Sequence, residues 1–442
     1  MLARPAAPVH RWGMTADITL HGPGDVVAIL PYQLGYHPHD SVVVVCLRGK
    51  RVGLVARTDL PLDEHVDEVV AMLMGPLARD GATSVIVVGY ESDPEVSQPL
   101  LVALVEQLER AGICVVDVTV VRDGRRYSPT CAEPCCPPEG VALPDPADVP
   151  GVAEYVALGR SPLRSRGAVE DLVAPEPWRC LGVARAVESR SRMPRARRRS
   201  AAAWSQVLAV GEKGRRAPDR RVVADLALGL ADIAWRDGLI AWLAPSVLPT
   251  EALDSKVMKL LTSAMPTWGG MGPGARPRAL RLVQGTEPVA GESSPTERDR
   301  RAAVTERDRR AAGTERDRRA AGTERDALAA RTGRPAPAEG VGRAERDALS
   351  IERDELLHRL LALCRSLPDE CAAEAAAVCT VAAHVAWIGG DGAIARVAVD
   401  RAVRLAPDYR LARLLERLVD QGVRLPPVSG AGRGPGALDQ VG

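Results

Sequence analysis

Residues 41–47 read SVVVVCL, a nearly continuous run of β-branched side chains. A strand that is covered on both faces has this composition, because neither face needs polar residues to meet water. The turn Arg48-Gly49-Lys50-Arg51 follows, and residues 52–58 form a second strand pattern. The two segments therefore predict a β-hairpin at the centre of a buried sheet.

Helix and strand patterns alternate after this hairpin. Residues 63–79 carry apolar side chains at helical spacing, and residues 95–111 predict a second helix. Residues 84–89 (SVIVVG) and 113–121 (ICVVDVTVV) predict two further strands. Two successive β-α-β units favour right-handed crossovers, so we expect an α/β fold with a layered, mixed or mainly parallel sheet and flanking helices.

Composition divides the rest of the chain into segments. We expect an α/β domain with a cysteine-rich loop at its end, a helical region, a low-complexity linker, a C-terminal helical segment and a disordered tail, over residues 14–150, 151–265, 266–342, 343–422 and 423–442. Residues 222–243 are apolar on nearly all sides and predict a long buried helix. Residues 390–407 (GDGAIARVAVDRAVRLAP) resemble the second half of a tetratricopeptide repeat. One such unit is no array, so we expect a helical hairpin that packs on its neighbours.

The linker contains a nine-residue repeat. Its copies, of the type TERDRRAA, begin at Thr296, Thr305, Thr314 and Thr323. Nine residues make two and a half helical turns, so successive copies face opposite sides and form no continuous apolar seam. We expect a solvated helix or disorder here rather than a coiled coil.

Charge and hydropathy limit the classes of partner. The formal net charge is +1, which gives no general attraction to nucleic acid or to an anionic membrane. The basic run at residues 189–200 has no interleaved aromatic residues, so we expect a solvated segment there. No apolar run of about 18 residues and no signal peptide is recognisable. We expect a cytoplasmic protein whose nine cysteines are thiols, and a protein partner rather than nucleic acid.

Three cysteines lie within six residues, at Cys131, Cys135 and Cys136, in a proline-rich segment. They could bind zinc, with His37 or His39 as a fourth ligand, because zinc prefers four nitrogen or sulfur ligands. They could instead form a redox switch, or be structural thiols that close a loop. The spacing is not the C-x-x-C of strong zinc sites, so the three interpretations stay open.

Polar residues follow the predicted strands at their carboxyl ends, where open α/β sheets bind ligands. These are Arg57 and Asp59, then Tyr90, Glu91, Ser92 and Asp93, and then Arg122 and Asp123. An arginine with several carboxylates could hold a phosphorylated or metal-bound ligand. No Walker loop and no G-x-G-x-x-G motif occurs, which argues against a standard nucleotide site.

The segment before the first buried strand has residue types found in hydrolases. His37 could act as a base, Asp40 as the carboxylate that orients it, and Ser41 as a nucleophile. The alternative is that Asp40 and Ser41 cap a turn while His37 packs against a neighbouring strand.

Four motifs together resemble one protein family. They are PYQLGYHPHDSVVVV at residues 31–45, RTDLP at 57–61, CAEPCCPPEG at 131–140, and AWIGGDGAIARVAVDRAVRLAPDYRLARLL at 386–415. In this order the motifs resemble an actinobacterial family known as domain of unknown function 4192. The family usually carries Phe where this chain has Tyr36, so an aromatic ring is kept. The resemblance implies no reaction.

Two functions follow as hypotheses. The missing catalytic motifs and the repeat-like C-terminus favour a non-enzymatic interaction or regulatory protein. The alternative is a small-ligand binder or enzyme that combines the strand-end loops with the cysteine loop and could hold zinc. The two differ in whether Arg57, Asp59, Arg122 and the cysteines converge on one cleft.

Overall fold

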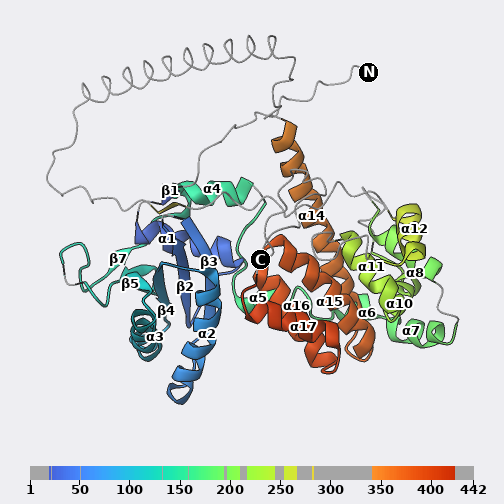
Figure 1. The fold of residues 1–442 in the computed structure, drawn as a ribbon, viewed down its shortest axis with the longest axis horizontal. Coiled ribbons are helices and arrows are strands. Elements are labelled where there is room, and N and C mark those ends of the chain that lie inside the picture. The colour runs from blue at the N-terminus through green and yellow to red at the C-terminus, as the bar shows by residue number, and fades with distance from the viewer. Residues whose placement is uncertain are drawn as a thin grey trace, which may run out of the picture. The chain divides into compact units, whose positions relative to one another are not determined.

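The computed structural model describes residues 19–20, 22–49, 51–131, 133–157, 159–193, 197–209, 217–243, 253–265, 281–282 and 341–423. The chain forms two compact units, one of residues 1–284 and 349–442 and the other of residues 285–348. The nine-residue repeats lie outside the described residues. The features below belong to the first unit, apart from the start of one helix (Figure 1).

The N-terminal half contains one mixed sheet. Its described strands run in the order β1-β8-β3-β2-β4-β5-β6-β7. Their bounds are β1 Thr19–Leu20, β2 Ser41–Arg48, β3 Arg51–Asp59, β4 Ser84–Tyr90, β5 Cys114–Arg122, β6 Arg125–Tyr127, β7 Val141–Ala142 and β8 Arg281–Leu282. Strand β8 comes from within the predicted linker, so part of that segment adds to the sheet.

Strand direction departs from the mainly parallel pairing that the β-α-β pattern favours. Strand β2 pairs antiparallel with both β3 and β4, and β4 pairs parallel with β5. The tight turn after β2, with Gly49 at φ +59°, makes a hairpin and so places an antiparallel strand in the middle. As a consequence β3, β4 and β5 run in the same direction and end at the same edge of the sheet.

Helices cover both faces of the sheet (Figure 1). Helices α2 (Val66–Asp80) and α3 (Gln98–Arg110) pack on the face that carries Val42 and Val44. Helices α1 (Pro23–Leu34) and α4 (Pro150–Ala157) pack on the face of Val43 and Val45. All four valines are at most 1% exposed, which confirms a strand buried on both sides. A short 3-10 turn, Asp63–His65, precedes α2.

The rest of the first unit is helical and shares one apolar core. Its helices are α5 Arg166–Glu170, α6 Pro177–Cys180, α7 Val183–Ser191, α8 Arg197–Val207, α10 Arg220–Gly229, α11 Ile233–Leu243, α12 Ser255–Ala264, α14 Val341–Ser366, α15 Ala372–Gly389, α16 Gly392–Leu405 and α17 Arg410–Asp420. Helices α15 and α16 form the predicted C-terminal hairpin, and Gly390 makes its turn at φ +84°. Among the described helices, α15 alone is long and apolar enough to cross a bilayer, contrary to our expectation of none. Most of it is buried in the helical core, which accounts for its apolar composition.

The predicted single helix over residues 222–243 is two helices, α10 and α11. Asp232 begins the second one by accepting a hydrogen bond from the backbone N–H of Trp235 (3.1 Å). At the end of the first, Gly229 leaves no room for a side chain, because a Cβ atom would lie 2.0 Å from Ser200 Oγ. The break allows the buried Trp235 indole to donate to Ser200 (3.0 Å).

The basic run at residues 189–200 is also folded where the structure describes it. Arg190 in α7 pairs with Asp225, with Nε 2.6 Å from Oδ1, and Arg197 in α8 pairs with Asp232, with Nε 2.6 Å from Oδ2. The expectation of a solvated segment is therefore wrong for these two arginines, because their charges are met by carboxylates on and after α10.

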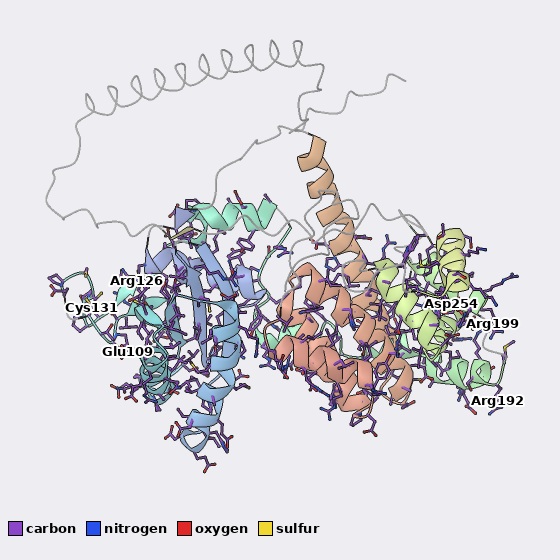
Figure 2. The ribbon with its side chains drawn as sticks, in the orientation of Figure 1. Glu109, Arg126, Cys131, Arg192, Arg199 and Asp254 are labelled. Atoms are coloured by element: carbon purple, nitrogen blue, oxygen red, sulfur yellow. The ribbon has the colours of Figure 1, made fainter. Side chains whose placement is uncertain are left out.

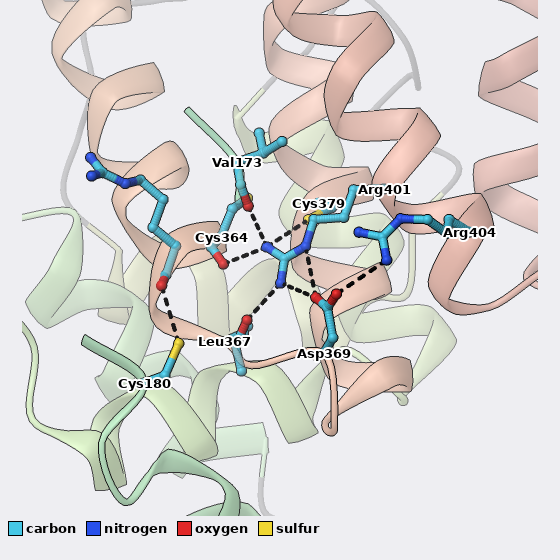
Figure 3. Close-up of polar contacts among 9 residues, drawn as sticks. Val173, Cys180, Cys364, Leu367, Asp369, Cys379, Arg401 and Arg404 are labelled. Carbon is cyan, nitrogen blue, oxygen red and sulfur yellow. Dashed lines mark hydrogen bonds and ion pairs between the residues drawn. The ribbon is translucent and has the colours of Figure 1, made fainter. Parts of the chain in front are cut away.

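A buried arginine ties the helical part together (Figure 3). The side chain of Arg401 in α16 is 3% exposed. Its nitrogens donate to the carbonyls of Val173, Cys364 (2.7 Å) and Leu367 (2.7 Å) and to the carboxylate of Asp369 (2.8 Å). Every nitrogen of this guanidinium has a partner, since Nε also reaches Asp369 (3.2 Å). Arg401 therefore fastens α16 to the end of α14 and to the segment after α5.

Candidate functional site

The strand-end residues predicted from the sequence share one edge of the sheet. Ser41, at the start of β2, lies opposite Asp59 of β3 on one side and Tyr90 of β4 on the other. Tyr90 in turn lies opposite Val121 of β5, beside Arg122. The register thus brings three strand ends and the loop before β2 together, although they do not all face one cavity.

A small polar cluster occupies the middle of this edge. Asp40, at φ +38°, accepts hydrogen bonds from the backbone N–H (2.8 Å) and the hydroxyl (2.7 Å) of Ser92. His39 Nδ1 lies 2.9 Å from Asp40 Oδ2, and His39 Nε2 lies 3.2 Å from Ser92 Oγ. Burial would raise the pKa of Asp40, but the Ser92 hydrogen bonds and the His39 imidazole lower it. The Ser92 hydroxyl lies closer to the carboxylate than to the imidazole, and the exposed cluster joins the loop before β2 to the loop after β4.

The hydrolase-like arrangement of His37, Asp40 and Ser41 is not formed. Ser41 is fully buried, and no described residue forms a hydrogen bond with its hydroxyl. His37 is exposed, and its backbone N–H donates to the carbonyl of Leu163 (2.9 Å). Asp40 contacts His39 and Ser92 instead, so it serves the loop contact that its turn conformation allows.

Arg122 and Glu91 form a partly buried ion pair at the end of β5. Arg122 Nη1 lies 3.1 Å from Glu91 Oε2, and its guanidinium lies over the ring of Tyr127, 4.6 Å from the centroid. Glu91 also accepts hydrogen bonds from the hydroxyl (2.6 Å) and the backbone N–H (3.0 Å) of Ser97 before α3. These contacts fix the β4–α3 loop and satisfy both side chains.

Tyr90 lies in the core behind the edge. It is 7% exposed, and its hydroxyl has no hydrogen-bond partner within the described parts of the chain. Burial raises its pKa far above the ordinary value. The hydroxyl therefore stays protonated at neutral pH.

Arg57 is the unusual member of the predicted set. Its side chain is 8% exposed, and Nη2 contacts Asp59 Oδ1 (2.5 Å) and donates to the carbonyl of His39 (3.3 Å). The buried Nε and Nη1 have no hydrogen-bond partner among the residues that the structure describes. The Arg57 guanidinium carbon lies 5.9 Å from the centroid of the Tyr36 ring. Burial raises the pKa of Tyr36 although Arg57 opposes the shift, so the phenol keeps its proton.

Asp59 bridges two arginines. Its Oδ1 faces Arg57, and its Oδ2 accepts a hydrogen bond from Arg166 of α5 (2.7 Å). The segment that leads to α5 is held by a bridge between Tyr36 and Leu163, in which the Leu163 N–H donates to Gly35 (2.8 Å). Arg166 is therefore positioned by backbone contacts as well as by its ion pair.

A cavity of about 720 Å³ lies against this arrangement, within the first unit. Strand β3 and α5 contribute to its lining, as do residues near the α15–α16 turn. Its charged lining residues are Arg57, Asp59, Arg160, Arg166, Arg396 and Asp420. Its aromatic lining residues are Tyr36, Tyr155 and Trp387. A lining with both basic and aromatic groups suits a polar ligand that also has a flat or apolar part.

The three cysteines form a separate cluster in the loop between β6 and β7. One ligand atom from each of Cys131, Cys135 and Cys136 lies within 4.8 Å of the others. Cys131 is labelled near Arg126 in Figure 2. Strands β3 and β6 are four steps apart in the sheet, about 19 Å at about 4.8 Å per strand. The cysteines and Arg122 do not line the cavity, so the structure does not join them with Arg57 into one cleft.

Sequence reasoning found Arg57 and Asp59 but not their surroundings. Arg166 lies 107 positions after Asp59, and Trp387 comes from the far end of the chain. No spacing rule links such positions. Tyr36 carried a usable signal, since it belongs to the aromatic-glycine motif before β2.

Comparison with known proteins agrees with the four motifs. A family model described as domain of unknown function (DUF4192) matches residues 23–267 and 262–426. No curated protein and no solved structure matches the chain. The matched residues include the strand-end edge, the cysteine loop and the helical hairpin, and they cover most of the sequence. The chain therefore belongs to the DUF4192 family.

Proposed function

We propose that this chain is a non-enzymatic binding or regulatory protein that takes a small anionic ligand, a carboxylate or a phosphate, in the cavity beside β3. The observation that carries the proposal is the guanidinium of Arg57, which is buried against the cavity with Nε and Nη1 unpaired. A buried donor without a partner costs about 1–3 kcal/mol. An anion that accepts from both nitrogens would remove that cost, because the guanidinium fork matches carboxylate and phosphate oxygens.

Other buried arginines of the same chain provide a comparison. Arg401 donates to three backbone carbonyls and one carboxylate. Arg359 of α14, also 8% exposed, donates from Nε and Nη2 to Glu355 and from Nη1 to the carbonyl of Val207. These two guanidinium groups have all their nitrogens paired, and Arg365 leaves only Nε without a partner among the described residues. Arg57 differs, which favours an acceptor that comes from outside the chain.

The lining of the cavity has four arginines and two aspartates. Three of the arginines, Arg160, Arg166 and Arg396, also pair with carboxylates outside the lining, those of Asp391, Glu170 and Asp400. Arg57 is therefore the arginine through which the cavity would meet an anion. Asp59 is held between Arg57 and Arg166, so its charge is already met. The volume of about 720 Å³ lies within the range of about 300–1,000 Å³ that small-ligand sites occupy. Nε and Nη1 are covered in this structure, so binding of an anion to them requires neighbouring side chains to move.

The same lining favours binding over covalent catalysis. Its described members include no serine, cysteine or histidine. Thr58 is the lining residue with an aliphatic hydroxyl, and its Oγ1 donates to the backbone carbonyl of Asp59 (3.2 Å). Nucleophilic catalysis needs a nucleophile beside a base, which these side chains do not supply.

Titration calorimetry of the full chain with inorganic phosphate and with succinate tests the proposal. We expect at least one of the two anions to bind, and Arg57→Met to weaken that binding by about tenfold or more, which is about 1.4 kcal/mol. Arg57→Lys keeps the charge but loses the two-pronged guanidinium, so its affinity for the anion should lie between those of the wild type and Arg57→Met. Arg48→Met is the matched control, since Arg48 is an exposed arginine on β2 that does not line the cavity.

Two results would overturn the proposal. One is that neither anion binds the wild-type chain at millimolar concentration. The other is that Arg57→Met binds as tightly as the wild type, which would place the anion elsewhere.

A further inference from the structure

The geometry points to a second site, independent of the cavity: Cys131, Cys135 and Cys136 bind one zinc ion through three thiolates and leave the fourth coordination position open. The arrangement of the sulfur atoms carries this inference. Cys135 Sγ and Cys136 Sγ are 3.8 Å apart, and all three sulfurs lie within 4.8 Å of one another. Zinc–sulfur bonds of about 2.3 Å at tetrahedral angles place sulfurs about 3.8 Å apart.

The loop holds the sulfurs together without a disulfide. All three cysteines are free thiols. A turn brings the N–H of Cys136 to the carbonyl of Glu133 (2.8 Å), and a second turn brings the N–H of Gly140 to the carbonyl of Pro137 (2.8 Å). Pro134 restricts the backbone of the first turn, and Pro137 and Pro138 restrict that of the second. The cluster is therefore formed before any metal enters, which lowers the entropy lost on binding.

The end of the loop is fastened to the sheet. Arg125 of β6 donates from Nε to the carbonyl of Glu139 (2.8 Å) and from Nη2 to that of Gly140 (2.8 Å). Gly140 has φ +73°, and a Cβ atom there would lie 2.7 Å from the ring of Tyr127. Glycine at this position lets the chain pass closely over Tyr127 and return into β7. Cys131, Cys135 and Cys136 belong to none of the hydrophobic core clusters of the described residues, so these contacts hold the loop in place.

Accessibility separates this cluster from the structural thiols of the chain. Cys364 and Cys379 are fully buried in the helical core. Cys135 is exposed, and Cys131 and Cys136 are partly exposed. Thiols that merely fill space are normally buried, whereas metal ligands need an entry path.

The structure also limits the ligand set. The His37 or His39 imidazole suggested as a fourth ligand is not in the cluster, which among the described residues contains the three cysteines alone. Three protein ligands and an open position are typical of catalytic or exchangeable zinc rather than structural zinc. Each thiol gives its proton to solvent as its sulfur binds, and a water molecule or an external ligand completes the tetrahedron. No electron is transferred, so no oxidant is needed.

Metal content and cobalt substitution test the site on the full chain. After purification under reducing conditions and incubation with zinc, we expect about one zinc per chain after desalting. Cobalt in its place should give the strong visible bands of tetrahedral thiolate coordination. Cys131→Ser, Cys135→Ser and Cys136→Ser should each lose most of the zinc and change the cobalt spectrum. Cys114→Ser is the matched control, because Cys114 is an exposed single thiol at the start of β5.

Several outcomes would overturn the inference. One is a zinc content near zero in a chain whose thiols titrate as fully reduced. A second is an equal loss of zinc in Cys114→Ser. A third is that the three cysteines form a disulfide in air and the chain does not bind added zinc. The last result would indicate a redox loop instead. Arg57→Met should keep its zinc, since β3, which carries Arg57, and β6, which precedes the cysteine loop, are four strands apart, about 19 Å. A failure of this site therefore leaves the anion proposal standing, and the reverse also holds.

Discussion

Arg401 in the helical core and Arg57 at the sheet edge are both more than nine-tenths buried, yet their surroundings differ. Arg401 meets the carbonyl ends of a helix and a loop, so its charge is spread over oxygen atoms of the chain. Arg57 meets one carboxylate and one carbonyl through a single nitrogen. The comparison shows how a cationic side chain that holds a fold differs from one that is left open for a ligand.

The largest expected effect comes from removing Arg401. Arg401→Met should lower the free energy of unfolding by about 3–5 kcal/mol, because it leaves buried carbonyls without donors. Chemical denaturation measures this. The control is Arg404→Met, which also contacts Asp369 (3.1 Å) but is 61% exposed and should cost about 1 kcal/mol or less. Equal losses of unfolding free energy in the two variants would show that the buried contacts of Arg401 stabilise the fold no more than the exposed contact of Arg404.

Removing Arg57 should change the free energy of unfolding in the opposite direction. Arg57→Met should raise the free energy of unfolding by about 1 kcal/mol without ligand, because two unpaired buried nitrogens disappear. Asp59 keeps Arg166 as a partner in the variant. The same denaturation assay applies, and saturating anion should then stabilise the wild type but not the variant. A loss of more than about 2 kcal/mol would indicate that Arg57 is a structural arginine like Arg401.

The smallest expected effect concerns His384 in α15, a buried histidine that becomes a cation when it is protonated. Burial lowers the pKa of His384 below its ordinary 6.5, while its Nδ1 lies 2.8 Å from the carbonyl of Thr380. The folded state then binds fewer protons than the unfolded state. Its contribution to stability is full above about pH 6.5 and is lost as the pH falls toward the folded-state pKa.

Denaturation at several pH values checks this expectation. His384→Gln should show a weaker loss of stability below pH 6.5 than the wild type. His65→Gln, which removes an exposed histidine, is the control variant. A wild-type stability that is flat between pH 7 and pH 5 would show that the helical core accepts a charge at His384.

Local pattern predicted the elements of the sheet well. The run at residues 41–47 and the turn at Gly49 indicated a doubly buried strand and a hairpin, and both are present. The pattern could not show that the neighbour of β4 is β2 and not β3, because strand order depends on contacts between distant segments. It also missed the break between α10 and α11, where a tertiary contact of Gly229 with Ser200 overrides an apolar run.

The candidate site was predictable only in part, for the same reason. Residues at strand ends can be read from the chain once strands are assigned, which is why Arg57 and Asp59 were found. Their importance depends on what the guanidinium does not contact, and that requires coordinates. The cysteine cluster was visible as composition, whereas the spacing of its sulfurs was not.

The antiparallel position of β2 has a consequence for how the chain reaches its native state. The hairpin of β2 and β3 closes over a short turn, so it can form within microseconds from neighbouring residues. Strand β4 must then dock on the far side of β2 after α2 has carried the chain across that strand, which demands a longer loop closure. We expect the hairpin to be the nucleus of assembly and the β2–β4 pairing to limit its rate, so replacing Gly49 should slow folding more than it speeds unfolding.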